Sequence, residues 1–591
     1  MNITRNFDLL AHLKENHNFD IAISGKRHGK WTNYSTNEYV ENVDNISYGL
    51  LKLGIGRGDK VAIVSTNRPE WNFVDFGASQ LGCVTVPLYP TISEGDYKYI
   101  LNNAEVKAIF VESMEIYQKI AAVKNEIPSL RYIYSFEHIP GLPLWTELSE
   151  NGKANPAPEK VAELKALVKP EDLMTLIYTS GTTGTPKGVM LSHNNIMANI
   201  RSCQHLFPFP PGNRILSFLP LCHIFERMVG YLYHYRGIVI YYAESMDTIG
   251  DNLKEIKPKA FSTVPRLLEK VYDRIVATGH GLTGIKKSLF FWALALGNKY
   301  ELHRKNGWWY HTKLKIADRL IFSKWRAALG GEVEIIVSGA SALQPRLARV
   351  FTAAGIIILE GYGLTETSPV IAVNTPDEAG RCFGTVGPVI PDVDIKIAED
   401  GEILCKGPNV MQGYYKLPEA TKEAIDADGW FHTGDVGTLV EGKYLKITDR
   451  KKEVFKTSGG KYIAPQPMEN KFKESPFIEQ IMVIGENEKF PGALITPAWD
   501  YLKDWCGKNG IPFQSHDELV QKPEVIAAYQ KEVDLYNTEF GSWETIKKFE
   551  LIPNDWSIEG GEMTPTLKLK RKPILTKYSK FVDKIYQHTA N

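Results

Sequence analysis

Short apolar runs rich in β-branched residues alternate with segments of helical periodicity over the first 380 residues or so. Strands that alternate with helices favour a layered α/β architecture with largely parallel sheets, since crossover helices cover the sheet faces. We therefore expect a large N-terminal domain built from layered α/β subdomains. The runs that we predict to be buried strands are Val61 to Val64, Ala108 to Val111, Leu173 to Tyr178, Ile215 to Leu219, Ile238 to Tyr242, Ile335 to Val337 and Ile356 to Leu359.

The pattern of predicted elements changes after about residue 380, where short strands and turns dominate. This predicts a small β-rich subdomain over about residues 380–450. A charged stretch, Asp449 to Glu453, follows it, and we interpret this stretch as a linker. The remaining segment of about 140 residues is itself long enough to form a domain. We therefore predict two domains, residues 1–450 and 451–591.

Composition excludes several classes of function. The 591 residues include 69 Lys and Arg against 69 Asp and Glu, and this neutral balance argues against a general nucleic-acid binder. The six cysteines are scattered without a Cys-x-x-Cys pair, which fits a reducing cytosol and argues against a zinc site. Met1 to Asn18 lacks the apolar core of a signal peptide, and no apolar stretch is long enough to span a bilayer, so we expect a cytoplasmic protein.

The most informative motif follows the predicted strand Leu173 to Tyr178 and combines glycines, hydroxyl residues and one lysine. Backbone N–H groups, hydroxyls and an ammonium group together form a cradle for phosphate oxygens. A Walker A loop needs Gly-Lys-Ser/Thr, but here Pro186 precedes Lys187 and Gly188 follows it. The alternative is a turn without a ligand. The candidate phosphate-binding residues are Thr179, Ser180, Gly181, Thr182, Thr183, Gly184 and Lys187.

Two further glycine-containing segments carry acidic residues. Gly361 to Thr367 directly follows a predicted strand, where α/β proteins place ligand groups, and its Glu366 is a hard oxygen ligand suited to Mg²⁺. Asp428 to Gly437 offers Asp435 in a glycine turn, and such a carboxylate can accept hydrogen bonds from ribose hydroxyls. The structural alternatives are a helix N-terminal carboxylate and an Asx turn.

Two basic segments complete the set. Arg450, in the proposed linker, could hold a ribose or a phosphate, although a solvated charge run is the alternative. The segment Glu562 to Lys572 places several lysines on a predicted flexible turn, which could deliver a cation to a phosphoryl or carboxylate group. A solvated basic tail is the alternative for this segment.

One segment carries an excess of positive charge, although the chain as a whole is neutral. Residues 285–326 hold ten Lys and Arg against two Asp and Glu, interleaved with aromatic and apolar residues such as Trp308 and Trp309. Basic helices with an aromatic face can lie on anionic membranes. The alternative is a pair of amphipathic helices packed on the body with a solvated basic face. We expect peripheral contact with the inner face of a membrane only under the first interpretation.

Taken together, these motifs resemble the AMP-forming acyl-CoA synthetases of the adenylate-forming superfamily, and most closely their long-chain fatty-acyl branch. The first loop matches the family motif without a gap, and Tyr362 to Glu366 matches Tyr-Gly-x-Thr-Glu. Asp428 to Lys456 resembles the fatty-acyl-CoA synthetase signature nearly throughout, and the resemblance covers almost the whole chain in order. It implies a β-barrel-like subdomain at about 380–450 and a small mobile α+β C-terminal domain.

The resemblance also implies a two-step reaction in which ATP and a carboxylate give an acyl-adenylate and pyrophosphate, and coenzyme A then takes the acyl group. Lys568 would be the catalytic lysine, with Lys570 as the alternative, and Lys452 the hinge between steps. Phosphates would contact the first loop and Thr365, and Mg²⁺ would contact Glu366 and Thr182. The resemblance further implies that the nucleotide contacts Gly339, Ala340, Tyr362 and Gly363, and that its ribose contacts Asp435 and Arg450. It also implies that the acyl group lies at His223 and that coenzyme A binds at Gly459, Gly460 and Lys461.

Three other functions remain open at this point. The nearest is an aryl-CoA or medium-chain acyl-CoA ligase, and the next is a ligase that loads acyl chains on acyl carrier protein. The third is a non-catalytic acyl-binding or uptake protein on the same fold. The retained Lys187, Glu366, Asp435 and Lys568 argue against the third.

Overall fold

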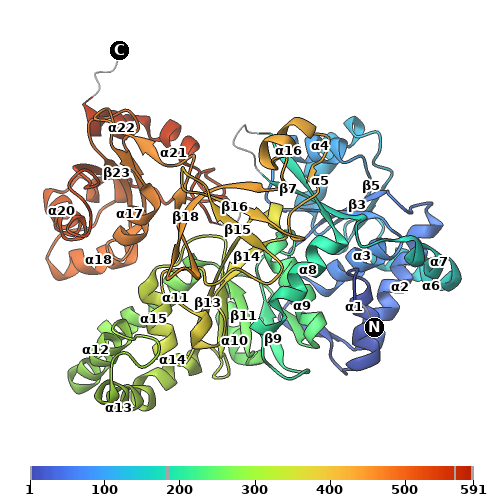
Figure 1. Cartoon of the computed structure of the whole chain (residues 1–591), viewed down its shortest axis with the longest axis horizontal. Helices are drawn as coiled ribbons and strands as arrows, with labels where there is room; N and C mark the ends of the chain where they lie inside the picture. The colour runs from blue at the N-terminus through green and yellow to red at the C-terminus, as the bar shows by residue number, and fades with distance from the viewer. Residues whose placement is uncertain (1–2, 180–184, 565–566, 588–591) are drawn as a thin grey trace.

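The computed structural model describes residues 3–179, 185–564 and 567–587. The chain forms two large sheets, a smaller antiparallel sheet and a C-terminal α+β unit (Figure 1). Ser180, Gly181, Thr182, Thr183 and Gly184, at the centre of the predicted phosphate loop, lie outside the described residues. No helix in the described ranges combines the length and apolarity needed to cross a membrane.

The first large sheet has seven strands and forms around the predicted strands Val61 to Val64, Ala108 to Val111 and Leu173 to Tyr178. β3, β4, β5 and β6 run parallel, because helices return the chain between them, whereas β7 and β8 form an antiparallel hairpin. In spatial order the strands are β17 (Gly413–Tyr414), β8 (Lys187–Ser192), β7 (Leu173–Thr179), β4 (Val84–Leu88), β3 (Lys60–Val64), β5 (Val106–Val111) and β6 (Tyr132–Ser135).

The second large sheet has eight strands and includes the other four predicted buried strands. β9 to β13 and β1 run parallel, whereas β2 and β14 are antiparallel edge strands. In spatial order the strands are β14 (Val370–Val373), β13 (Ile357–Gly363), β12 (Ile335–Ser338), β11 (Ala260–Thr263), β9 (Arg214–Ser217), β10 (Val239–Tyr242), β1 (Ile23–Arg27) and β2 (Lys30–Tyr34).

Helices fill the space between these sheets and cover their outer faces. One continuous core contains residues of both sheets together with those of α2, α3, α8 and α9, so the two sheets share a helical layer. The helices of this part are α1 (Asp8–Asn16), α2 (Thr36–Lys52), α3 (Pro69–Gln80), α4 (Glu94–Asn103), α5 (Met114–Val123), α6 (Trp145–Ala154), α7 (Pro158–Leu167), α8 (His193–Cys203), α9 (Ile224–Arg236), α10 (Ile249–Ile256), α11 (Pro265–His280), α12 (Gly284–Asn298), α13 (Trp308–Ala317), α14 (Ser323–Ala328), α15 (Pro345–Ala353) and α16 (Pro418–Ala424).

The β-rich subdomain expected after residue 380 is a four-stranded antiparallel sheet. Its strands, in spatial order, are β15 (Asp394–Ile397), β16 (Glu402–Lys406), β18 (Phe431–Val440) and β19 (Tyr444–Arg450). Beyond a turn at 451–453 the C-terminal unit begins, with its own core. It contains β20 (Phe455–Lys456), β21 (Tyr462–Ile463), β22 (Ile478–Ile484), β23 (Gly492–Pro497), β24 (Lys548–Leu551), α17 (Pro465–Phe472), α18 (Trp499–Lys508), α19 (His516–Leu519), α20 (Pro523–Asn537), α21 (Arg571–Lys577) and α22 (Ser579–Tyr586).

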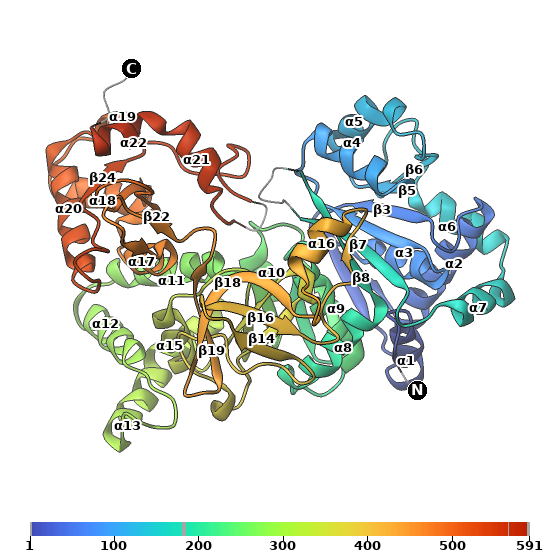
Figure 2. The same ribbon diagram turned by 45° about the horizontal axis from the view of Figure 1, so that its top comes forward.

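The C-terminal unit lies over the edge formed by β18, α11 and α15 (Figure 2). The segment between β24 and α21 runs from this unit toward the rest of the molecule, and it carries Lys568. The interpretation of Asp449 to Glu453 as a linker is wrong for its first two residues. Asp449 and Arg450 end β19, and Asp449 is buried. The backbone N–H groups of Arg450 and Gln466 donate to its carboxylate and offset the cost of that burial.

Candidate active site

Loops that carry several of the predicted site residues leave the same edge of the eight-stranded sheet. β9, β11, β12 and β13 are parallel neighbours, so their carboxyl ends point the same way. His223 follows β9, Gly339 and Ala340 follow β12, and Tyr362 and Gly363 end β13. The carboxyl edge of a parallel sheet is where α/β proteins bind ligands, and here it collects residues from distant parts of the sequence.

The backbone is closely packed at this edge of the sheet. A Cβ atom at Gly363 would lie 1.7 Å from the carbonyl oxygen of Pro369, so only glycine fits there. The Gly339 N–H donates to the Thr263 carbonyl at 3.2 Å, and Ala340 adopts φ 72°, a left-handed backbone that residues with a Cβ rarely adopt. The segment 339–340 therefore presents its backbone at the edge with little side chain above it.

Asp435 joins this edge from the antiparallel sheet. The Tyr362 hydroxyl donates to Asp435 Oδ2 at 2.8 Å, and Arg450 Nε lies 3.2 Å from Asp435 Oδ1. Burial raises the pKa of Asp435, and the guanidinium of Arg450 and the Tyr362 hydroxyl oppose that shift. These three side chains form a polar cluster that can present a carboxylate and a guanidinium to a ligand.

The prediction that Asp435 sits in a glycine turn is wrong. Asp435 lies within β18 and pairs with Arg450 of β19. Gly434 has φ 72° and the register shifts after Val436, so the glycines bend a continuing strand rather than end it. The strand pairing is what brings Asp435 and Arg450 side by side, although 428–437 and 447–453 look like unrelated segments in the sequence.

Lys568 reaches this cluster from the C-terminal unit. It lies on a tight turn in which its N–H donates to Thr564 Oγ1 at 3.0 Å and its carbonyl accepts from the Thr564 N–H at 2.8 Å. Burial and then the nearby Arg450 guanidinium lower the pKa of Lys568 to about 8, while the carboxylates of Asp435, Glu453 and Glu366 oppose the shift. The ammonium group of Lys568 is therefore within electrostatic reach of the side chains at the sheet edge. Lys570 occupies the N-cap position of α21, where its side chain makes no capping hydrogen bond.

His223 lies within electrostatic reach of the same ammonium group. Its Nδ1 accepts the N–H of Phe225 at 3.2 Å at the start of α9, so in the neutral ring the proton sits on Nε2. Burial and then the charge of Lys568 lower the pKa of His223 to about 4. The imidazole is therefore neutral at physiological pH and can donate one hydrogen bond into the site.

Tyr414 was missed by sequence reasoning and connects two predicted site residues. Its hydroxyl donates to Glu366 Oε1 at 2.9 Å, and Lys187 Nζ lies 4.9 Å from the centre of its ring. β17, which carries Tyr414, pairs with β8 beside the predicted phosphate loop. The sequence gives no signal for this, because Tyr414 belongs to a two-residue strand far from either motif.

The two ends of the predicted phosphate loop are joined in the β7–β8 hairpin. Thr179 ends β7, Lys187 begins β8, and the two residues are paired. Thr365 and Glu366 lie in a short 3₁₀ turn after β13, and the carbonyl of Glu366 accepts from the Met411 N–H at 2.8 Å. The β7–β8 hairpin and the turn of Glu366 are thus connected, because β17 pairs with β8 and Met411, just before β17, donates to Glu366.

The structure does not bring the predicted hinge and coenzyme A residues into this cluster. Lys452 lies exposed on the turn between β19 and β20. Gly459, Gly460 and Lys461 form the exposed tip of the β20–β21 hairpin, where Ser458 N–H donates to Glu488 and Lys461 Nζ lies 5.5 Å from the Trp543 ring centre.

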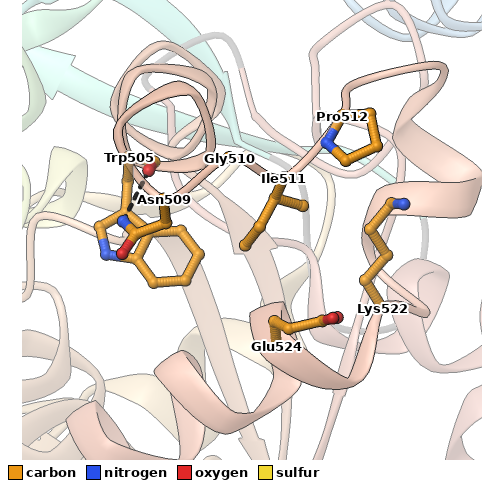
Figure 3. Close-up of a pocket in the computed structure, with 7 residues that line it drawn as sticks. All are labelled: Trp505, Asn509, Gly510, Ile511, Pro512, Lys522 and Glu524. Carbon is orange, nitrogen blue, oxygen red and sulfur yellow. Dashed lines mark hydrogen bonds between the residues drawn. The ribbon is translucent and has the colours of Figure 1, made fainter.

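A separate hollow of about 350 Å³ lies in the C-terminal unit between the end of α18 and the start of α20 (Figure 3). Asn509 donates to the Trp505 carbonyl at 2.8 Å on one side, and Lys522 and Glu524 lie on the other. It shares no residue with the cluster around Asp435, so it is not part of the candidate active site.

The residues around Glu366 fit a magnesium ion held largely by phosphate oxygens. Mg²⁺ in nucleotide sites commonly takes one or two carboxylates and substrate phosphates rather than a cage of protein ligands. Glu366 Oε2 accepts no hydrogen bond within the described ranges, and those ranges contain no group of three or more His, Cys, Asp or Glu placed to hold a metal. A single carboxylate beside a phosphate-binding loop is consistent with that arrangement.

Two family models identify this chain as an AMP-binding enzyme. The model of the AMP-binding enzyme family matches residues 11–415, and that of the AMP-binding enzyme C-terminal domain matches residues 452–590. The chain belongs to the AMP-binding enzyme family and is an AMP-forming acid–thiol ligase. ATP, Mg²⁺ and coenzyme A are the small molecules that this class uses.

Similar proteins with curated names cover nearly the whole chain. The long-chain-fatty-acid–CoA ligase FadD15 of Mycobacterium bovis is 34% identical over 566 residues, which are 94% of this chain and 93% of that protein. The peroxisomal long chain acyl-CoA synthetase 7 of Arabidopsis thaliana is 34% identical over 95% of this chain and 82% of its own length. The long-chain-fatty-acid–CoA ligase 1 of Homo sapiens is 32% identical over 94% and 82%.

Solved structures share the fold at lower identity. The anthranilate CoA ligase AuaEII in complex with anthranoyl-AMP has a TM-score of 0.73 and 18% identity, with 97% of each chain covered. The adenylation domain of a carboxylate reductase from Mycobacterium chelonae has a TM-score of 0.75 and 22% identity, with 99% of this chain and 91% of that chain covered. These likenesses confirm the predicted fold class, a large α/β domain followed by a small C-terminal one.

Proposed function

We propose that this enzyme activates a long-chain fatty acid with ATP to form an acyl-adenylate and pyrophosphate, and then transfers the acyl group to coenzyme A. The observation that carries this proposal is that the buried Lys568 lies within electrostatic reach of Asp435, Arg450, Glu366 and His223. The long acyl chain is supported by the names of the relatives, which are long-chain ligases from a bacterium, a plant and a mammal.

The first step brings two anions together, so the site must supply positive charge and hydrogen-bond donors. In our proposal Lys187 and the 179–184 loop hold the β- and γ-phosphates, and Thr365 contacts the α-phosphate. Asp435 and Arg450 bind the ribose, and Gly339, Ala340, Tyr362 and Gly363 accommodate the nucleotide. Mg²⁺, held by Glu366 and Thr182, would neutralise phosphate charge when bound.

Lys568 is proposed to bridge the attacking carboxylate and the α-phosphate. An ammonium group on a long stem reaches both groups as a point charge, and it concentrates positive charge where the pentavalent transition state gains negative charge. The carboxylate oxygen bonds to the α-phosphorus while the bond to pyrophosphate breaks. His223, neutral and with its proton on Nε2, would line the path of the acyl group.

The second step needs a different arrangement of the C-terminal domain. We place the boundary of this domain at residues 450 and 451 and its hinge at Lys452, which the exposed turn between β19 and β20 supports. Lys568 occupies the space beside the α-phosphate, and the thiol needs room to attack the acyl carbon. Gly459, Gly460 and Lys461 would then approach the site and line the coenzyme A path, since their hairpin lies beyond that hinge.

We also propose that the enzyme contacts membranes through residues 285–326. Ile285, Trp308 and Trp309 have 80%, 68% and 69% of their surface exposed, and Ile316 and Leu320 are exposed as well. These apolar side chains stand among ten Lys and Arg residues. Interfacial helices that bind anionic lipid combine these two features, and a long-chain fatty acid is delivered from such a surface.

Flotation with liposomes tests the membrane proposal. We expect the enzyme to float with vesicles that contain anionic lipid at low salt, and the Trp308→Ser/Trp309→Ser variant to remain in solution. Trp543 is an exposed tryptophan outside residues 285–326, so Trp543→Ser is the matched control and should float normally. Equal flotation of all three proteins would contradict the proposal.

Pyrophosphate release tests the catalytic proposal. We expect release that depends on fatty acid, rises with acyl chain length, and yields acyl-CoA when coenzyme A is added. A preference for aryl or medium-chain acids would indicate the nearest alternative function. Transfer to acyl carrier protein rather than coenzyme A would indicate the second alternative, and the absence of acid-dependent pyrophosphate release would indicate a non-catalytic protein.

A further inference from the structure

A cluster of charged side chains lies where the C-terminal domain meets the large domain. It joins Arg266 and Glu269 of α11 and Arg346 of α15 to Lys473, Glu474 and Glu479 around α17 and β22. We propose that this cluster is an ionic latch that holds the C-terminal domain in the orientation that presents Lys568 to the active site. This inference rests on the proposed two-step reaction, and it assigns Glu269 and Lys473 as positioning residues for the first step.

Glu269 is the centre of the latch. Its side chain is 6% exposed, and its carboxylate accepts from Arg266 at 3.2 Å and from Gln344 at 3.0 Å, both in the large domain. Lys473 of the C-terminal domain lies 3.6 Å from Glu269 Oε1. The ammonium group of Lys473, half-buried at 19% exposure, is thus paired across the domain boundary in a poorly hydrated place.

Two further contacts cross the same boundary. Arg346 donates to the backbone carbonyl of Glu474 at 3.1 Å, and its guanidinium lies 5.1 Å from the Tyr272 ring centre. Arg266 also pairs with Glu479. α17 and its neighbours face α11 and α15 in both views (Figures 1 and 2). The contacts of Arg346 with Glu474 and of Arg266 with Glu479 must break if the C-terminal domain rotates about the turn at 451–453.

The composition of the cluster makes such a latch reversible. A buried charge left without a partner is strongly unfavourable, and that would trap the domain in one orientation. Here Glu269 keeps Arg266 and Gln344 when Lys473 departs, so the large domain retains a paired carboxylate. Lys473 and Glu479 would pass into water, where isolated charges are well solvated. The latch therefore favours one orientation without preventing the other.

The latch acts through the position of the domain, because its members do not contact the reacting groups. Lys568 is coupled to Arg450, Asp435, Glu453 and Glu366, and none of these belongs to the latch. Loss of the latch should therefore lower the fraction of enzyme molecules in which Lys568 lies in the active site. The rate of adenylate formation in those molecules should stay unchanged. An equilibrium between two orientations responds in this way to the loss of a contact made in only one of them.

The test compares the two half-reactions in Lys473→Gln and Glu269→Gln. We expect acid-dependent ATP–pyrophosphate exchange to fall by about tenfold, which is within the usual range for conformational coupling. Thioester formation from supplied acyl-adenylate should be unchanged or faster. Lys473→Arg should restore exchange, and the double variant should lose no more than the worse single variant, because both remove one contact.

Lys471→Gln is the matched control. Lys471 lies on the same helix and pairs with Glu474 and Glu539 of the C-terminal domain, so it loses the same charge without an interdomain partner. It should keep full exchange activity. An equal loss of both half-reactions in Lys473→Gln, or an equal loss of exchange in Lys471→Gln, would overturn the latch. A wild-type enzyme without acid-dependent exchange would instead overturn the proposed function.

Discussion

Lys568 lies close enough to His223 for its positive charge to act on the imidazole, although the two residues belong to different domains. Together with burial, that charge lowers the pKa of His223 to about 4. This interaction requires the C-terminal domain to face the sheet edge that carries Asp435 and Glu366. It is the arrangement that we propose for the first half-reaction.

Replacement of Lys568 should separate the two half-reactions. We expect Lys568→Ala to reduce acyl-adenylate formation by roughly 10² to 10³, the usual loss when one group that stabilises transition-state charge is removed. Thioester formation from supplied acyl-adenylate should persist, because the lysine has left the site by then. Lys570→Ala is the control and should keep both activities, since Lys570 occupies the N-cap position of α21 and its side chain makes no capping hydrogen bond. Equal loss of both half-reactions in Lys568→Ala would contradict the assignment.

The same lysine predicts the alkaline limb of the pH profile. Burial and Arg450 lower the pKa of Lys568 to about 8, so the ammonium form is present below that pH and is lost above it. We expect kcat/KM for adenylate formation to decline above about pH 8, since this parameter reports the free enzyme. The decline in kcat should occur at higher pH than the decline in kcat/KM, because bound phosphates stabilise the ammonium form of Lys568.

Lys568→Arg provides the check on that interpretation. A guanidinium keeps its proton throughout this range, so the alkaline limb should disappear even if the variant is slower. His223 should not contribute a limb between pH 5 and 8, because its pKa of about 4 leaves it neutral there. An unchanged limb in Lys568→Arg would assign the titration to another group.

Restriction of the turn at 451–453 should affect the second half-reaction more than the first. Lys452→Pro fixes one backbone angle at the exposed turn between β19 and β20, where the domains would rotate. We expect thioester formation from supplied acyl-adenylate to fall by about tenfold or more, with exchange activity largely kept. Lys452→Ala removes the side chain without restricting the backbone and should behave like wild type. The reverse order of effects would exclude this hinge.

Local patterns in the sequence predict the strands well, because a buried parallel strand needs only a short continuous apolar run. β3, β5, β7, β9, β10, β12 and β13 all coincide with such runs to within a few residues. The sequence also predicts at which edge of the sheet the site forms, because parallel strands place their carboxyl ends together.

The position of Asp435 illustrates what the sequence could not provide. A Gly-Asp-x-Gly pattern is typical of a turn, but β16 and β19 supply hydrogen-bond partners on both sides, so the segment continues as β18. Tyr414 was missed for a related reason. Its role depends on the pairing of β17 with β8, which is a long-range contact that no local pattern encodes.

The hydrogen bond between Tyr362 and Asp435 should matter for ATP binding. Tyr362→Phe removes one donor from a carboxylate and keeps the ring, and hydrogen bonds to charged groups are worth about 1.5–3 kcal/mol. We expect KM for ATP to rise by about tenfold or more, with a smaller change in KM for the acid. Tyr444→Phe is a suitable control, because its hydroxyl donates to the Ala379 carbonyl at the opposite end of β19. Equal effects of both substitutions on KM for ATP would contradict a ribose site at Asp435.

Removal of one partner of a buried ion pair beneath the site should strongly destabilise the large domain. Arg227 and Asp75 have no exposed side-chain surface, and Arg227 also donates to Thr175 of β7 at 2.8 Å and to Thr85 of β4 at 2.7 Å. Arg227→Met leaves Asp75 as a buried carboxylate without its cation, which typically costs about 3–5 kcal/mol.

We therefore expect Arg227→Met to unfold at a markedly lower temperature than wild type in a thermal melt of the full chain. Arg57 and Asp172 form an exposed pair at 2.9 Å, with side chains 47% and 33% exposed, so Arg57→Met should cost less than about 1 kcal/mol. Arg227 also fixes the start of α9, which carries His223, and β7, which leads into the predicted phosphate loop. The surviving folded fraction of Arg227→Met should consequently show a higher KM for ATP, whereas a pure stability effect would leave KM unchanged.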